Sequence, residues 1–209
     1  MTTFHFNGQH LDNDLVTSIS SLLDAFNIPN LLWGNYLLTV YGVPTVVDGV
    51  SFVPPYKHLH IDDEFAILLY KKSDVLWEFP EFEAAFHDTS ADIMFASDAR
   101  LPPATLGRGR GHFPHLSSVR IPSPSRYCEA LILLLCRDYG TTRETYWVAI
   151  LTYMLEFVDG TDILNEGGLT EGHKQFYHAL KLGDPTMYPI LKDLHRDFLK
   201  RRLPQVKQN

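Results

Sequence analysis

The sequence of 209 residues contains little cysteine and no long apolar run. Its two cysteines, Cys128 and Cys136, lie in a segment with helical periodicity that would separate them by about 12 Å, beyond disulfide reach. We therefore expect neither a disulfide framework nor a zinc cluster. No segment reaches the ~18 apolar residues of a membrane span, and the N-terminal stretch lacks the order of a signal peptide, so we expect a cytoplasmic protein without membrane contact.

Positive charge is also in short supply, because 18 Lys and Arg face 25 Asp and Glu for a net charge of −7. This balance argues against bulk nucleic-acid binding. The bases are nevertheless concentrated in two segments, residues 100–120 and 192–207. An anionic partner would meet these segments, and the predicted anion-binding residues are Arg108, Arg110, Arg201 and Arg202. A mobile loop and a solvated tail explain the same pattern about as well.

Hydrophobic residues are plentiful and their spacing predicts an α/β fold. A helical stripe runs from Leu15 to Phe26, after Asp12 and Asp14, either of which could cap it. Strands are expected at 30–33, 46–53, 64–72 and 91–97, with a short helix at 35–41 between the first two. We expect a small mixed or parallel sheet of nucleotidyltransferase-like type, followed by a helical C-terminal half.

The length fits one domain, 1–209, with an α/β core at 11–98, a basic loop at 99–122 and a helical half at 123–202. Apolar residues at helical spacing recur through that last segment. Gly140, Gly160 and Gly183 fall where C-terminal caps of helices are expected.

The segment from Trp33 to Thr45, followed by 46–52, resembles the nucleotidyltransferase superfamily over about residues 28–53. In that superfamily a Gly-rich turn opens a short helix near the nucleotide phosphates, and the next strand carries two Mg²⁺-binding carboxylates at i and i+2. Here those positions hold Gly49 and Ser51, while Asp48 alternates to the other face. The resemblance supports the fold and speaks against nucleotidyl transfer, so we predict no metal and no cofactor.

The same opening, Trp33-Gly34 to Tyr41-Gly42-Val43-Pro44-Thr45, is similar to that of a group of fungal proteins related to arginine-containing cyclodipeptide synthases. The similarity includes the later segment 123–131 and covers most of residues 20–158. It implies a biosynthetic enzyme of secondary metabolism with a small-molecule or aminoacyl-tRNA substrate. The Asp-Asp-x-x-Glu motif of that group falls on residues 55–59, which contain no acid. The alternative is a catalytically inactive relative that binds a small molecule or a protein.

Candidate site residues follow from these resemblances and from isolated polar groups. The catalytic candidates are Asp48, Ser51 and Glu129, and the substrate-binding candidates are Trp33, Asn35, Tyr36, His58 and Arg126. Three groups of these residues also have explanations that involve no functional site. The alternating run His58, His60, Asp62 is more typical of a solvated loop than of a metal site. An ion pair or a cap would explain Arg126 and Glu129. The Gly-rich segment 107–112 suits an anion clamp or a disordered connector.

Overall fold

The structure is a computed structural model, and it describes residues 11–54, 59–61, 66–82, 91–116 and 118–202. The chain divides into two compact units, residues 1–126 and 127–209. Helix α4 (Pro124–Arg137) contains the boundary between them. The single-domain organisation stays a prediction.

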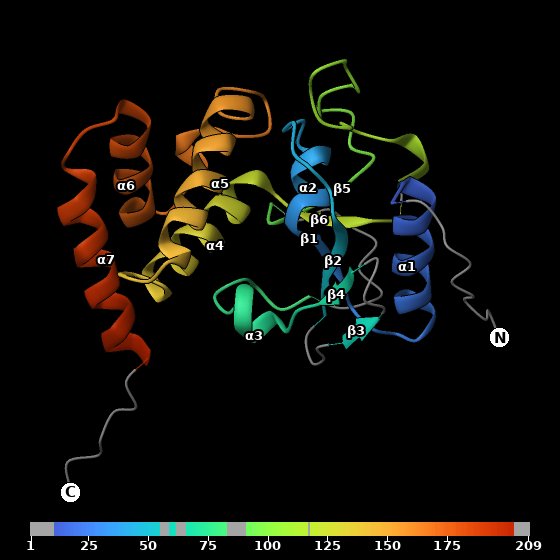
Figure 1. The fold of residues 1–209 in the computed structure, drawn as a ribbon, viewed down its shortest axis with the longest axis horizontal. Helices are drawn as coiled ribbons and strands as arrows, with labels where there is room; N and C mark the ends of the chain where they lie inside the picture. Colours follow the sequence, from blue (N-terminus) through green and yellow to red (C-terminus); the bar gives the residue numbers. More distant parts are fainter. Residues whose placement is uncertain (1–10, 55–58, 62–65, 83–90, 117, 203–209) are drawn as a thin grey trace, which may run out of the picture. The chain divides into compact units, whose positions relative to one another are not determined.

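The first unit contains a four-stranded mixed sheet in the order β1-β2-β4-β3 (Figure 1). The strands are β1 (Leu31–Trp33), β2 (Gly49–Val53), β3 (Leu59–Ile61) and β4 (Ala66–Leu69). Strand β2 pairs antiparallel with β1, where Trp33 lies opposite Ser51, and parallel with β4, while β3 pairs antiparallel with β4. The mixed α/β class is therefore confirmed.

The membership of the sheet differs from the prediction in one strand. Segment 91–97 was expected to join it, but β5 (Ile93–Phe95) pairs with β6 (Arg120–Pro122) in a separate two-stranded sheet. The fourth strand is instead β3, which was interpreted as a polar loop. Both β3 and β6 are only three residues long, and the arginine and proline of β6 conceal a strand signal.

Helix α2 (Gly34–Val40) connects β1 to β2 and packs on both strands. Gly34 has a φ of +73°, and a Cβ there would lie 3.2 Å from the Ser51 Oγ, so the turn needs glycine for its conformation and for its close approach to β2. The predicted strand-turn-helix-strand order over 31–53 is confirmed, although β2 begins at Gly49 rather than at residue 46.

Helix α1 (Asn13–Ala25) follows Asp12, whose Oδ1 accepts the Leu15 N–H at 3.0 Å as predicted for an N-cap. Leu15, Val16 and Ile19 are buried, whereas Phe26 at its C-terminal end is exposed. The remaining short helices of this unit are α3 (Lys72–Val75) and the 3₁₀ helix η1 (Pro114–Leu116).

A buried polar network connects α1, β1 and β6. The guanidinium of Arg120 donates to Asp24 Oδ1, which also accepts from Asn30 Nδ2 at 3.0 Å. The Ser20 hydroxyl donates to Asn30 Oδ1 at 3.0 Å. Because Arg120 is only 3% exposed, it belongs to the interior and not to the basic surface that residues 100–120 suggested.

The second unit is helical, as predicted, and contains α5 (Arg143–Phe157), the 3₁₀ helix η2 (Glu166–Gly168), α6 (Glu171–Leu182) and α7 (Met187–Arg202). Gly183 adopts a φ of +63° as the C-cap of α6, and Gly140 and Gly160 also have positive φ. Both cysteines are buried, and neither forms a disulfide. No helix within the described residues is long and apolar enough to cross a membrane.

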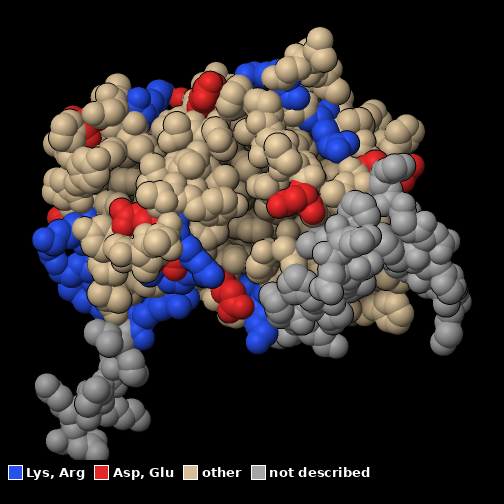
Figure 2. All heavy atoms as spheres, viewed as in Figure 1, with Lys and Arg blue, Asp and Glu red and all other residues tan. Residues whose placement is uncertain are grey.

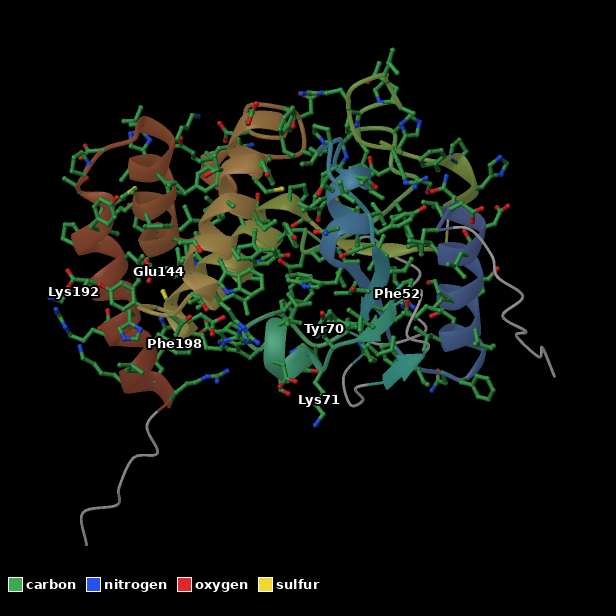
Figure 3. The ribbon with its side chains drawn as sticks, in the orientation of Figure 1. Phe52, Tyr70, Lys71, Glu144, Lys192 and Phe198 are labelled. Atoms are coloured by element: carbon green, nitrogen blue, oxygen red, sulfur yellow. The ribbon has the colours of Figure 1, made fainter. Side chains whose placement is uncertain are left out.

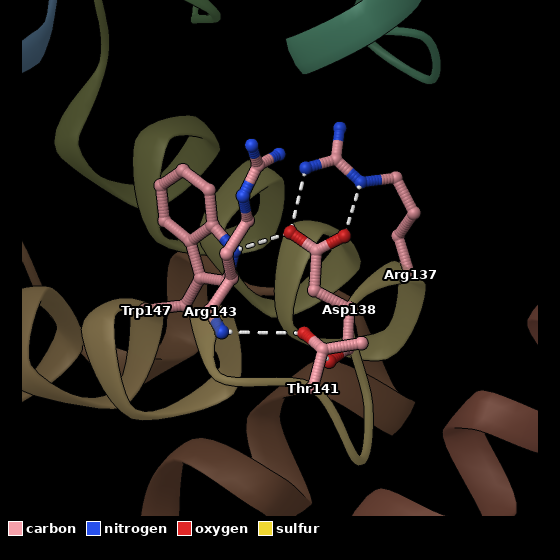
Figure 4. Close-up of polar contacts among 5 residues, drawn as sticks. All are labelled: Arg137, Asp138, Thr141, Arg143 and Trp147. Atoms are coloured by element: carbon pink, nitrogen blue, oxygen red, sulfur yellow. Dashed lines mark hydrogen bonds and ion pairs between the residues drawn. The ribbon is translucent and has the colours of Figure 1, made fainter.

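The α4–α5 connection is fixed by the carboxylate of Asp138 (Figure 4). Arg137 donates to it through Nε at 2.8 Å and Nη2 at 2.7 Å, and the Trp147 indole N–H donates at 2.7 Å. Thr141 closes the turn by donating its hydroxyl to the Asp138 carbonyl and accepting the Arg143 N–H. These contacts hold the two helices at a defined corner.

Candidate anion-binding site

The aromatic residues that the sequence assigned to substrate binding lie in the interior. Trp33 is 4% exposed, and Tyr36 is fully buried and donates its hydroxyl to Asn13 Oδ1 at 2.7 Å. Burial raises the pKa of Tyr36 to about 12, although Arg110 opposes this shift. Tyr36 therefore connects α2 to α1 and presents no free hydroxyl to a ligand.

The two catalytic candidates near β2 are separated by burial. Asp48 is exposed and precedes the strand, whereas Ser51 is buried beside Gly34. The structure does not bring them together as a catalytic pair. Among the described residues, no group of three or more His, Cys, Asp or Glu side chains could hold a metal ion. His58 lies outside the described residues.

Glu129 and Arg126 have protein partners of their own. Glu129 is buried in the second unit, and its Oε1 accepts the Thr170 N–H at 2.6 Å and lies 3.8 Å from His173 Nδ1. It thereby satisfies a backbone donor at the start of α6, as a capping carboxylate does. Arg126 donates to Asp92 at 2.6 Å in the first unit. These contacts favour the structural explanation for both residues.

The predicted basic loop is docked on the C-terminal end of α2. Gly109 N–H donates to the Gly42 carbonyl and Gly111 N–H to the Thr39 carbonyl, each at 2.9 Å. A Cβ on Gly109 would lie 2.4 Å from Thr39 O, and one on Gly111 would lie 2.2 Å from Pro102 O. Glycine is needed here because the two backbones are in contact. The segment is thus unlike the disordered connector that the sequence also allowed.

Arg110 completes this docking. Its Nη2 donates to the Leu11 carbonyl at 3.0 Å, and its guanidinium carbon lies 5.0 Å from the centre of the Tyr36 ring, within cation–π range. The side chain is half-buried, whereas that of Arg108 is exposed. Arg110 therefore has a structural role in addition to any contact with a ligand.

A cavity of about 510 Å³ opens between the basic loop and the segment after α2. Its floor is Thr39, one wall is the loop from Gly107 to Arg110, and the other is the segment from Pro44 to Val47. Asn35 holds this second wall, because its side-chain N–H donates to the Val46 carbonyl at 3.2 Å. Asn35 thus supports the wall of the pocket, its contact with a substrate stays a prediction, and no sequence motif indicated the wall that it supports.

The chemistry of this pocket is basic on one side and apolar on the other. Arg108 and Arg110 supply two guanidiniums, and no carboxylate lines the cavity among the described residues. The carbonyls of Thr39 and Gly42 already accept loop N–H groups. The charged residues that line the cavity, among those described, are therefore both basic, which suits an anion. Figure 2 shows basic atoms gathered over this loop at the top of the view.

The second predicted anion-binding segment is the end of α7. Arg201 and Arg202 are exposed there, and the Arg202 guanidinium carbon lies 5.2 Å from the centre of the Phe198 ring. Lys192 points outward, while Phe198 lies on the opposite, buried side of α7 (Figure 3). Lys200 pairs with Asp197 at 2.9 Å. This surface belongs to the second unit and lines no part of the cavity.

The fold and the site together define a mixed α/β unit with a basic surface pocket, followed by a helical unit. No protein-family model matches the chain, and no curated protein matches it. The crystal structure of an antigenic nucleotidyltransferase-like protein from Paracoccidioides brasiliensis is similar over 86% of this chain and 91% of that one. The sequence identity is 13% and the TM-score is 0.41. A similarity of this size does not establish a function for this chain.

Proposed function

We propose that this protein is a non-catalytic binding protein whose first unit holds a small anionic molecule in the pocket between residues 44–47 and 107–110. The observation that carries the proposal is the pair of guanidiniums on a loop anchored by backbone hydrogen bonds beside a cavity of about 510 Å³. Volumes of a few hundred Å³ are typical of small-molecule sites. A loop held in place before binding loses little conformational entropy when the ligand arrives.

Binding without catalysis is favoured by the surroundings of the acidic candidates. Glu129 is engaged by the Thr170 N–H in the second unit, and Asp48 is an exposed carboxylate outside the pocket lining. General acid–base catalysis needs a titratable group within hydrogen-bond reach of the reacting atom. Among the described residues, the polar side chains that line the cavity belong to two arginines and two threonines, and none of them is a carboxylate or an imidazole.

The test is calorimetric titration of the full chain with inorganic phosphate, acetate and citrate at low salt. Arg108→Gln should weaken binding of the best anion at least about tenfold, since a charged hydrogen bond contributes about 1.5–3 kcal/mol. Arg143→Gln removes the same charge from the second unit and should leave affinity unchanged. Loss of affinity in both variants alike, or in neither, would reject this site.

A second candidate function is the cyclodipeptide synthase activity implied by the resemblance over residues 20–158. What favours it is the strand-turn-helix-strand arrangement over 31–53, which has the form that the resemblance implies. Expression in a heterologous host, followed by mass spectrometry, should reveal arginine-containing diketopiperazines absent from the empty-vector strain. A folded protein that yields none would remove this candidate and leave the binding function in place.

A further inference from the structure

The rim of the pocket carries unusually exposed apolar side chains. Val46, which lines the cavity, is 82% exposed, and Leu106, which directly precedes the cavity residue Gly107, is 105% exposed. These are the two highest exposures among the large apolar side chains of the described residues. Single exposed apolar residues are common, but here Pro44, Val46 and Val47 line one side of a cavity that Arg108 and Arg110 also line, and Leu106 directly precedes the basic side.

Both side chains are held on backbone with defined hydrogen bonds. The Val46 carbonyl accepts from Asn35 Nδ2, and Leu106 lies within a turn closed by the Arg108 N–H donating to the Thr105 carbonyl at 3.1 Å. Directly after that turn, the Gly109 N–H donates to the Gly42 carbonyl at 2.9 Å. The apolar rim and the guanidiniums are therefore kept at one place on the first unit.

We infer that the ligand is an anionic amphiphile, a carboxylate or phosphate ester with an apolar chain or ring; this rests on the proposed anion-binding function. The anionic group contacts Arg108 and Arg110, and the apolar part covers Pro44, Val46 and Val47 in the cavity wall and extends to Leu106. Water is displaced from apolar surface that is otherwise left exposed, and this adds affinity that a bare anion does not gain. The two chemistries of the pocket are thereby used together.

The experiment compares sodium octanoate, sodium acetate, inorganic phosphate and 1-octanol as ligands of the full chain, by titration calorimetry and by methyl NMR of labelled Leu and Val. Octanoate should bind at least about tenfold more tightly than acetate, since each buried methylene contributes about 0.8 kcal/mol or roughly a factor of four. The methyl resonances of Val46 and Leu106 should shift with octanoate. Val46→Ser and Leu106→Ser should each weaken octanoate binding about threefold to tenfold and weaken acetate binding less, and neither surface change should unfold the chain.

The outcomes distinguish failure of the amphiphilic ligand from failure of the anion site. If acetate or phosphate binds as tightly as octanoate and Arg108→Gln weakens all three, the anion site stands and the amphiphilic ligand is overturned. If 1-octanol binds as tightly as octanoate, or Arg108→Gln changes nothing, the anion site itself is overturned and the inference with it. A preference for octanoate that Leu106→Ser and Val46→Ser leave intact overturns the assignment of the apolar rim.

Discussion

Arg120 and Asp24 form an ion pair inside the first unit, joining strand β6 to the C-terminal turn of helix α1. The side chain of Arg120 is 3% exposed and that of Asp24 is 31% exposed. The guanidinium is therefore removed from water and paired with the Asp24 carboxylate. Burial raises the pKa of Asp24, while Arg120 and Asn30 oppose that shift. The ion pair with Arg120 therefore offsets part of the effect of burial on the Asp24 carboxyl group.

Replacing Arg120 with methionine removes the guanidinium and so breaks its ion pair with the Asp24 carboxylate. We expect the free energy of unfolding at pH 7 to fall by about 3 kcal/mol, because removing one partner of a buried ion pair leaves the other charge uncompensated. The pKa of Asp24 should rise further in this variant. The difference in free energy of unfolding between the wild type and the variant should therefore shrink as the pH is lowered toward 4 and the carboxyl group takes up a proton. Urea denaturation measures both effects. Adding Asp24→Asn should restore part of the loss, and equal stability of Arg120→Met and the wild type would contradict the account.

The network also shows why the sequence misplaced part of the basic surface. Arg120 lies among residues 100–120 with no acid nearby in sequence, and its partner Asp24 is in the first helix. Arg100, in the same segment, pairs with Asp98 at 2.7 Å. The net charge of a segment does not show which of its arginines pair with carboxylates from other parts of the chain. Two of the four arginines in that segment are thereby held by carboxylates.

Helices and the β1-α2-β2 unit could be predicted because their signals are local: the apolar spacing of α1 and α5, the cap at Asp12, and the turn at Gly34. The pocket could not be predicted in this way. Its wall at Val46 depends on Asn35, and its basic loop depends on the contact between Gly109 and Gly42. Such contacts join residues whose proximity no periodicity encodes.

Substitution of Gly109 tests the docking of the basic loop. Gly109→Ala should lower the free energy of unfolding by about 1–3 kcal/mol and weaken anion binding, because the new Cβ would lie 2.4 Å from Thr39 O and the loop must move away. Gly107→Ala is the matched control: no atom lies within 4 Å of its Cβ, so only its φ of +79° is strained. Chemical denaturation should show a larger loss of stability, and calorimetry a larger loss of anion affinity, for Gly109→Ala than for Gly107→Ala. A larger loss for Gly107→Ala would show that the contact of Gly109 with the end of α2 does not anchor the loop.

The corner between α4 and α5 should give stability a pH dependence. Hydrogen bonds from Arg137 and then Trp147, opposed by burial, hold the pKa of Asp138 below its usual value. A lowered carboxyl pKa stabilises the fold above the pKa of the unfolded chain, and that contribution is lost as the pH falls through the folded value. Asp138→Asn should thus lower the free energy of unfolding by about 1–2 kcal/mol at pH 7. The difference in free energy of unfolding between this variant and the wild type should become smaller below about pH 4. Denaturation curves between pH 3 and 7 measure this; a constant difference would rule out the ionised pair as its source.

The synthase function makes a separate prediction for the end of α7. If an aminoacyl-tRNA is the substrate, filter retention of tRNA should weaken about one to three orders of magnitude between 50 and 200 mM salt for three to five phosphate contacts. Arg201→Glu combined with Arg202→Glu should reduce retention without unfolding the chain, since both side chains are exposed. Equal retention of this variant and the wild type would remove α7 as a nucleic-acid contact.

The contact between Gly109 and Gly42 has a consequence for the lifetime of the protein. The two pocket walls come from distant parts of the chain, so the pocket forms only after a long loop has closed and is absent from a partly folded chain. A ligand held there binds the native state alone and stabilises it by mass action. Because proteases act on the opened chain, a ligand that occupied the proposed pocket would slow degradation and raise the amount of protein as its concentration rises.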